Sequence, residues 1–289
     1  MHTKQTLITL LLGVACATGV QAECLSDAQA DDLAAHYLAR TPAANPEGLS
    51  DADGACTRAK FNARIAPRLG KVVGYKAGLT NPAVQKRFGT DKPVWGTLYE
   101  GMVQPSGATI DAAFGARPLF EADMLVRVKS AAVNQARTPM EVLEAIDQVI
   151  PFIELPDLLV QAPPRLNGAG VSAINVGARL GVAGQPLAVP ALRAERHALL
   201  DALQGMQVTL ADAQGAVLGR GKGSDILEHP LNAVVWLAQA LRQEGIALQP
   251  GDLVSLGSFS PLLPPKPGLT VTATYEGLPG AQPVRVTFK

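Results

Sequence analysis

The sequence is poor in aromatic and charged residues and carries no excess charge of either sign. Aromatic residues make up 4% and charged residues 17% of the chain, and 25 Lys and Arg balance 25 Asp and Glu. A balanced chain has no overall field to attract a polyanion or an anionic membrane, which disfavours a nucleic-acid partner. The 289 residues are 47% hydrophobic, enough to bury a large core, so the composition argues against disorder.

The chain also lacks an apolar run long enough to span a bilayer, which takes about 18 residues or more. Residues 1–22 instead have the pattern of a secretory signal, with Lys4 near the start, an uncharged apolar run over 7–20, and small residues ending at Ala22. We expect cleavage after Ala22 to release an exported, periplasmic protein with no membrane segment. The alternatives are an uncleaved anchor and a lipoprotein modified at Cys16, although the usual Leu is missing before that cysteine.

Cysteine and histidine are scarce. Removal of the signal leaves Cys24 and Cys56, and an oxidising compartment favours a disulfide between them over two free buried thiols. Such a bridge would contribute on the order of 3 kcal/mol. After residue 22 the only histidines are His36, His197 and His229, whose wide spacing disfavours a transition-metal site.

Periodicity predicts a helical N-terminal segment, 23–70, followed by one β-rich domain, 71–289, and hence an α+β fold. The first helix spans 26–40 and the second 51–69; the residues expected to face inward are Ala30, Leu33, Ala34, Tyr37 and Leu38, then Ala55, Ala59, Ile65 and Leu69. The expected strands are 71–76, 97–103, 119–128, 149–155, 173–178, 207–211, 253–256, 269–275 and 284–288. Two further helices are expected at 141–146 and 230–244.

Paired acids stand out in the strand 119–128. Side chains alternate along a strand, so Glu121 and Asp123 project from one face, opposite the apolar face. Adjacent carboxylates repel unless a cation lies between them, and a hard divalent ion is a natural partner. A solvated strand face with Arg127 as counter-charge is equally compatible with this segment.

Two other residues have unusual surroundings. Glu154 interrupts the apolar run 149–155, and a buried carboxylate needs a proton, a cation or a metal. With Glu121 and Asp123 it would form an all-oxygen site suited to Mg²⁺ or Mn²⁺. Lys76 lies between glycines, where a ligand can approach the backbone while the ammonium enters a pocket. The simpler interpretation of Lys76 is an edge-strand lysine facing water.

Six segments in order resemble the 2-keto-4-pentenoate hydratase and 4-oxalocrotonate decarboxylase branch of the fumarylacetoacetate hydrolase superfamily. They are 73–80 (VGYKAGLT), 96–102 (GTLYEGM), 120–123 (FEAD), 153–157 (IELPD), 229–238 (HPLNAVVWLA) and 250–258 (PGDLVSLGS). The similarity extends from about residue 50 to the C-terminus. The resemblance implies a mixed β-roll with packed helices, and it favours a homo-oligomer over a monomer.

The same resemblance implies the site. It places Mg²⁺ or Mn²⁺ on Glu121, Asp123 and Glu154 and matches Lys76 to the active-site lysine. Asn175, Ser258 and Asp157 correspond to substrate-binding positions, each with strand-end or turn hydrogen bonding as an alternative. The implied reaction is that of a lyase, a hydratase or decarboxylase, in which the metal chelates a small 2-oxo acid and stabilises its enolate.

Two alternatives remain open. A C–C hydrolase of acylpyruvates or other diketo acids would need a general base, for which His36 is a candidate. A non-catalytic exported protein that binds metal and a 2-oxo acid is favoured by the export signal and by Val94, which stands where the hydratases usually have an acid.

Overall fold

The computed structural model describes residues 24–289, so the expected signal segment 1–22 lies outside the described residues. Two curled sheets form the body. The larger one runs in the order β2 (Val94–Tyr99), β1 (Val72–Gly78), β11 (Leu253–Ser255), β5 (Glu121–Val128), β6 (Ile146–Leu155), β7 (Leu180–Ala183) and β3 (Val103–Pro105), with β8 (Leu187–Ala188) paired to β6. The smaller one runs β10 (Val217–Lys222), β9 (Gln207–Asp212), β12 (Thr270–Glu276), β13 (Val284–Phe288) and β4 (Thr109–Ile110).

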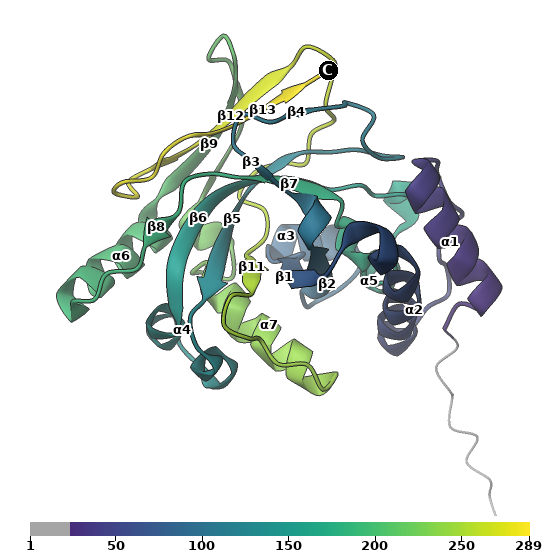
Figure 1. Cartoon of the computed structure of the whole chain (residues 1–289), viewed down its shortest axis with the longest axis horizontal. Helices are drawn as coiled ribbons and strands as arrows, with labels where there is room; N and C mark the ends of the chain where they lie inside the picture. The colour runs from purple at the N-terminus through teal and green to yellow at the C-terminus, as the bar shows by residue number, and fades with distance from the viewer. Residues whose placement is uncertain (1–23) are drawn as a thin grey trace, which may run out of the picture.

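The strands β5 and β6 curl through the centre of the larger sheet and are buried on both faces (Figure 1). On β5, Met124 and Val126 join the core that includes the smaller sheet, whereas Leu125 packs in a second core with residues of α1 (Asp27–Ala39) and α2 (Asp51–Leu69). Every expected strand overlaps an observed one except 173–178. The expectation of an α+β, β-rich fold is therefore confirmed.

Both N-terminal helices form where the sequence predicts them, because each begins at a capping box. The Ser26 hydroxyl accepts from the Gln29 amide, and Ser50 does the same for Asp53. The predicted faces are less accurate: Leu38 is 45% exposed and Ala59 is exposed. On α2 only Ile65, of the residues expected to face inward, is fully buried.

The buried face of α2 is polar because it carries Arg58. This side chain is 3% exposed and lies 3.5 Å over the Trp95 ring. Its guanidinium donates to the Ser172 hydroxyl at 2.8 Å and to both carboxylate oxygens of Glu244 at 2.6 and 2.7 Å. Arg58 therefore ties α2 to β2, α5 (Gly168–Ala173) and α7 (Asn232–Gln243).

The prediction of a strand at 173–178 is wrong. The segment contains the end of α5 and a 3₁₀ turn, Asn175–Gly177. Asn167 caps α5 through the Gly170 amide at 2.8 Å, and Gly54 lets the two helices approach closely, since a Cβ there would lie 2.6 Å from the Ala169 carbonyl oxygen. The apolar residues of this segment are buried against α2, α5 and β2, and short-range periodicity does not distinguish such packing from a strand.

The remaining helices lie around the sheets. The two expected at 141–146 and 230–244 are α4 (Pro139–Ala145) and α7; α3 (Pro82–Arg87) and α6 (Arg193–Gly205) were not expected. Figure 1 places α6 and α1 at opposite ends of the long axis. None of the helices within 24–289 is long and apolar enough to cross a membrane.

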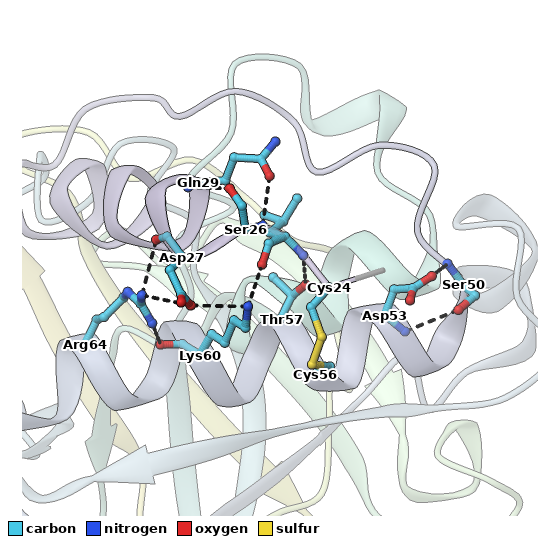
Figure 2. Close-up of a disulfide and its surroundings, with 11 residues drawn as sticks. Cys24, Ser26, Asp27, Gln29, Ser50, Asp53, Cys56, Thr57, Lys60 and Arg64 are labelled. Atoms are coloured by element: carbon cyan, nitrogen blue, oxygen red, sulfur yellow. Dashed lines mark hydrogen bonds and ion pairs between the residues drawn. A yellow bond between two sulfur atoms is a disulfide. The ribbon is translucent and has the colours of Figure 1, made fainter. Parts of the chain in front are cut away.

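The structure pairs Cys24 with Cys56, with their Cα atoms 5.6 Å apart (Figure 2). Polar contacts hold the same region: the Leu25 amide donates to Thr57 at 3.1 Å, and Lys60 pairs with Asp27 at 3.2 Å. The bridge therefore joins the start of the described chain to α2. Export of the protein stays a prediction.

We expect the exported protein to begin at Glu23 and to contain the Cys24–Cys56 bond. Its non-reduced intact mass should be about 2 Da below its reduced mass, because bond formation removes two thiol hydrogens. Double replacement by alanine should lower the free energy of unfolding by about 3 kcal/mol, since the unfolded loop is no longer closed. Alkylation of both thiols without reductant would contradict the bond.

Candidate active site

Three acidic side chains come together on the two central strands. β5 and β6 are antiparallel, and their register places Glu121 directly opposite Glu154, with Asp123 two residues further along β5. Glu121 is 7% exposed, Asp123 0% and Glu154 3%. The solvated-face interpretation is therefore wrong, and Arg127 is not the counter-charge, because it pairs with Asp147 at 2.7 Å.

Lys76 reaches these acids from β1. That strand lies inside the sheet, between β2 and β11, so Lys76 is not an edge residue and is only 3% exposed. Its ammonium pairs with the Glu154 carboxylate and donates to the Val176 carbonyl at 3.0 Å. The structure thus brings together Lys76, Glu121, Asp123 and Glu154.

Protein donors hold the Asp123 carboxylate. One oxygen accepts from the Gly257 amide at 2.9 Å and from its neighbour Met124, and the other accepts from the Ser255 hydroxyl. Gly257 has φ +104°, and a Cβ on it would lie 2.2 Å from Thr80 Oγ1. The backbone can reach Asp123 in this way only because residue 257 is glycine.

Tyr275 fixes the strands behind the site. Its hydroxyl lies 2.8 Å from the Phe152 carbonyl, also contacts the Asp123 carbonyl, and accepts from the Phe152 amide at 3.1 Å. Burial raises the pKa of this phenol far above its usual value. A neutral tyrosine from β12 therefore holds β5 and β6 at Asp123, a role that the sequence analysis missed.

The site is electrostatically unbalanced. Burial, followed by the charge of Glu154, raises the pKa of Glu121 well above its usual range. The same two causes raise the pKa of Asp123 to about 8, although its hydrogen bonds from Ser255 and Met124 oppose the rise. One lysine faces three buried carboxylates, so the site needs protons or an additional cation.

Glu121, Asp123 and Glu154 fit a hard divalent cation. All three offer carboxylate oxygens as ligands, and together they carry more negative charge than Lys76 balances. Within 24–289, however, no three His, Cys, Asp or Glu side chains are arranged to hold a metal ion directly. Two contacts account for this: Lys76 pairs with Glu154, and Asp123 turns toward Ser255 and Gly257. Metal binding would require these side chains to reorient.

A cavity of about 210 Å³ opens next to the charged residues, and we call it the inner cavity. Lys76, Glu121, Glu154 and Ser258 line one part of it. The charge of Lys76, followed by Ser258, opposes the effects of burial and Glu154 on the pKa of Glu121. The Ser258 hydroxyl donates to the Ser260 carbonyl at 2.5 Å. Ser258 therefore lines the inner cavity, and its contact with substrate stays a prediction.

The other two predicted substrate contacts do not line the inner cavity. Asn175 accepts from the Thr97 amide at 2.7 Å and donates to the Thr97 carbonyl at 2.9 Å. Asp157 accepts from the amides of residues 116, 117 and 159 at 2.7–3.0 Å. Both side chains fix backbone around the cavity, which is the structural alternative stated above for each.

His36 and Val94 do not line the inner cavity either. His36 is close to Thr41 at 2.8 Å and to Asp32 at 3.7 Å, so it does not serve as a base there. Val94 lines a separate pocket with Trp95 and Trp236. No histidine is among the residues that line the inner cavity in the described chain.

Comparisons with known proteins agree with this arrangement, although no protein-family model matches the chain. A 2-keto-4-pentenoate hydratase of Burkholderia vietnamiensis is 32% identical over 218 residues, 75% of this chain and 78% of the relative. A 4-oxalocrotonate decarboxylase of Pseudomonas putida is 28% identical over 249 residues, 86% and 89% of the two chains.

A solved structure matches over nearly its whole length. The 4-oxalocrotonate decarboxylase of Pseudomonas putida G7, complexed with magnesium and adipate, has a TM-score of 0.77 at 25% identity and covers 92% of this chain and 99% of its own. Sequence and structure therefore agree on the same relatives. The chain belongs to the 2-keto-4-pentenoate hydratase and 4-oxalocrotonate decarboxylase branch of the fumarylacetoacetate hydrolase superfamily, a branch of enzymes.

Proposed function

We propose that this protein is a divalent-metal-dependent lyase, a hydratase or decarboxylase, acting on a small 2-oxo or 2-hydroxydienoic acid. The observation that carries the proposal is the buried group of Lys76, Glu121, Asp123 and Glu154, three of which open onto the inner cavity. Relatives that are named as hydratase and decarboxylase support the reaction class.

Glu121, Asp123 and Glu154 would hold Mg²⁺ or Mn²⁺. The ion would supply a Lewis acid that polarises the 2-oxo group and so acidifies the neighbouring carbon. The ion would balance the excess negative charge of the three carboxylates, and Asp123 would turn toward it from Ser255 and the Gly257 amide. The magnesium in the related decarboxylase structure supports this choice of ion.

Lys76 would handle the proton. Its ammonium already lies at the carboxylates, and the Val176 carbonyl orients it at 3.0 Å. Once freed from Glu154, Nζ would donate to or accept from the carbon chain of the bound acid, while Ser258 would hydrogen-bond its carboxylate or oxo oxygen. The apolar remainder of the cavity would exclude bulk water from the reaction.

The two alternatives have less support. A C–C hydrolase would need a general base at the site, but the candidate, His36, does not line the inner cavity. A binding protein would use the same cavity without turnover, so kinetics separate it from a lyase. The homo-oligomer and the export of the protein stay predictions.

The first test concerns the metal. Glu154→Gln keeps the shape of the side chain and removes its charge, so we expect stoichiometric Mg²⁺ or Mn²⁺ binding by the wild type and a loss of at least 10-fold in affinity in the variant. Calorimetric titration measures both. Glu100→Gln, at an exposed acid outside the site, is the control. Equal affinities in wild type and Glu154→Gln would contradict the proposed ligand set.

The second test separates catalyst from binder. With metal present, Lys76→Met should lower kcat on 2-hydroxypenta-2,4-dienoate or 4-oxalocrotonate by roughly 100- to 10,000-fold, the usual contribution of a general acid or base. Metal binding should persist, because the three carboxylates remain. Lys71→Met removes an exposed ammonium just before β1 and should be neutral. Undiminished turnover in Lys76→Met would remove Lys76 from the mechanism, and no turnover by the wild type would favour the binding protein.

The raised pKa of Asp123 predicts how stability depends on pH without metal. Between about pH 4 and pH 8 the folded carboxyl keeps a proton that the unfolded chain has lost, so the free energy of unfolding falls as the pH rises. In EDTA, the Tm of the wild type should decline from pH 5 to pH 8 more steeply than that of Asp123→Asn, which cannot titrate there. Parallel Tm profiles would show that Asp123 titrates normally.

A further inference from the structure

A left-handed turn holds the carbonyl that orients Lys76. Val176 has φ 55° and ψ 33°, a conformation that a β-branched residue adopts only when its surroundings force it, and Asn175 before it also has φ 55°. The Val176 carbonyl accepts from the Lys76 ammonium at 3.0 Å. This backbone outlier therefore contacts the group to which the proposed function assigns proton transfer.

The Asn175 side chain fixes this turn against β2. Its amide group accepts from the Thr97 backbone N–H at 2.7 Å and donates to the carbonyl of the same residue at 2.9 Å. Gly96 permits the close approach, because a Cβ there would lie 2.5 Å from the Asn175 carbonyl oxygen. Gly96 also lies opposite Lys76 in the register of β1 and β2, so the turn is attached to the strand beside the lysine.

A third residue, Asn62, supports the turn from α2. The Asn62 side-chain nitrogen donates to the Asn175 side-chain oxygen at 3.1 Å and to the Thr97 hydroxyl at 3.2 Å. The Asn62 side-chain oxygen is buried and accepts no hydrogen bond from any residue in 24–289. A buried oxygen without a donor is unfavourable, so the orientation of Asn62 is explained by the groups to which it donates.

We propose that Asn62 is a positioning residue for Lys76. Through Asn175 it fixes the left-handed turn, and the turn fixes the Val176 carbonyl that holds the ammonium. This inference rests on the proposed function, in which Lys76 is freed from Glu154. Among the described residues, the Val176 carbonyl is then the hydrogen-bond acceptor left to the ammonium, so its position determines where Nζ meets the bound acid.

Asn62→Leu tests the proposal with a side chain of similar shape. The variant loses two donated hydrogen bonds but also loses the unpaired oxygen, so we expect its Tm to change little. With metal present, kcat on 2-hydroxypenta-2,4-dienoate or 4-oxalocrotonate should fall by about 10- to 100-fold, because a catalytic group is slightly misplaced, while KM changes by less than about twofold. If thermal unfolding shows that Asn62→Leu does not fold, Asn62→Ala is used in its place.

Thr57→Val is the matched control on the same helix. Thr57 is buried on α2 and accepts from the Leu25 amide at 3.1 Å, so this variant also keeps the shape of a side chain and removes a hydrogen bond. That hydrogen bond holds the start of the described chain rather than the turn. We therefore expect wild-type kcat in Thr57→Val, even if its Tm falls. An equal loss of kcat in both variants would assign the effect to α2 as a whole and overturn the role of Asn62.

Two further measurements locate the effect at Lys76. In the Lys76→Met background, Asn62→Leu should lower kcat no further, because Asn62 acts through a side chain that is then absent. A crystal structure of Asn62→Leu should show the Val176 carbonyl displaced from Lys76 Nζ by on the order of 1 Å, a shift large enough to slow the reaction.

The outcomes separate this inference from the proposed function. If the wild type has no turnover, the proposed function fails, and the crystal structure decides the inference: a displaced Val176 carbonyl supports it and an unmoved one overturns it. If the wild type turns over but Asn62→Leu keeps its kcat, or its loss adds fully to that of Lys76→Met, Asn62 does not position Lys76 and the proposed function stands.

Discussion

The ion pair between Lys76 and Glu154, buried beside two more carboxylates, is the constraint on which the rest of this structure depends. Removing charges from water is costly, and one ammonium does not compensate three carboxylates. The fold nevertheless places all four groups on three strands of the larger sheet, with Glu121 and Glu154 directly opposite each other. A stable core would not require such an arrangement. It is explained if the site exists to bind a cation and an anionic ligand.

The surrounding elements keep this group in place. Gly257 brings its amide to Asp123, and Tyr275 reaches from the smaller sheet to the backbone of β5 and β6. Asn175 and Asp157 fix the segments on either side of the cavity through backbone hydrogen bonds. The carboxylates proposed as metal ligands therefore lie on the central strands, while apolar residues that line the inner cavity lie on α3, on loops and at Val176.

The sequence predicted the site acids because a carboxylate in an apolar strand needs a partner, and it predicted α1 and α2 from the helical spacing of their apolar residues. Sequence patterns did not predict the features that depend on contacts between residues far apart in the chain. The polar face of α2 is buried because Arg58 meets Glu244, 186 residues away. Residues 173–178 have apolar character suited to a strand, but they form the end of α5 and a 3₁₀ turn that contacts α2 and β2, which are distant in the sequence. The contribution of Tyr275 likewise depends on contacts between sheets, which no local pattern encodes.

The most direct measurement is anomalous diffraction from crystals grown with Mn²⁺ and pyruvate. The account predicts one strong anomalous peak among the carboxylates of Glu121, Asp123 and Glu154, with the Lys76 ammonium moved from Glu154 toward the bound acid. A manganese peak elsewhere would contradict this expectation. So would an intact contact between Lys76 and Glu154 when pyruvate occupies the inner cavity.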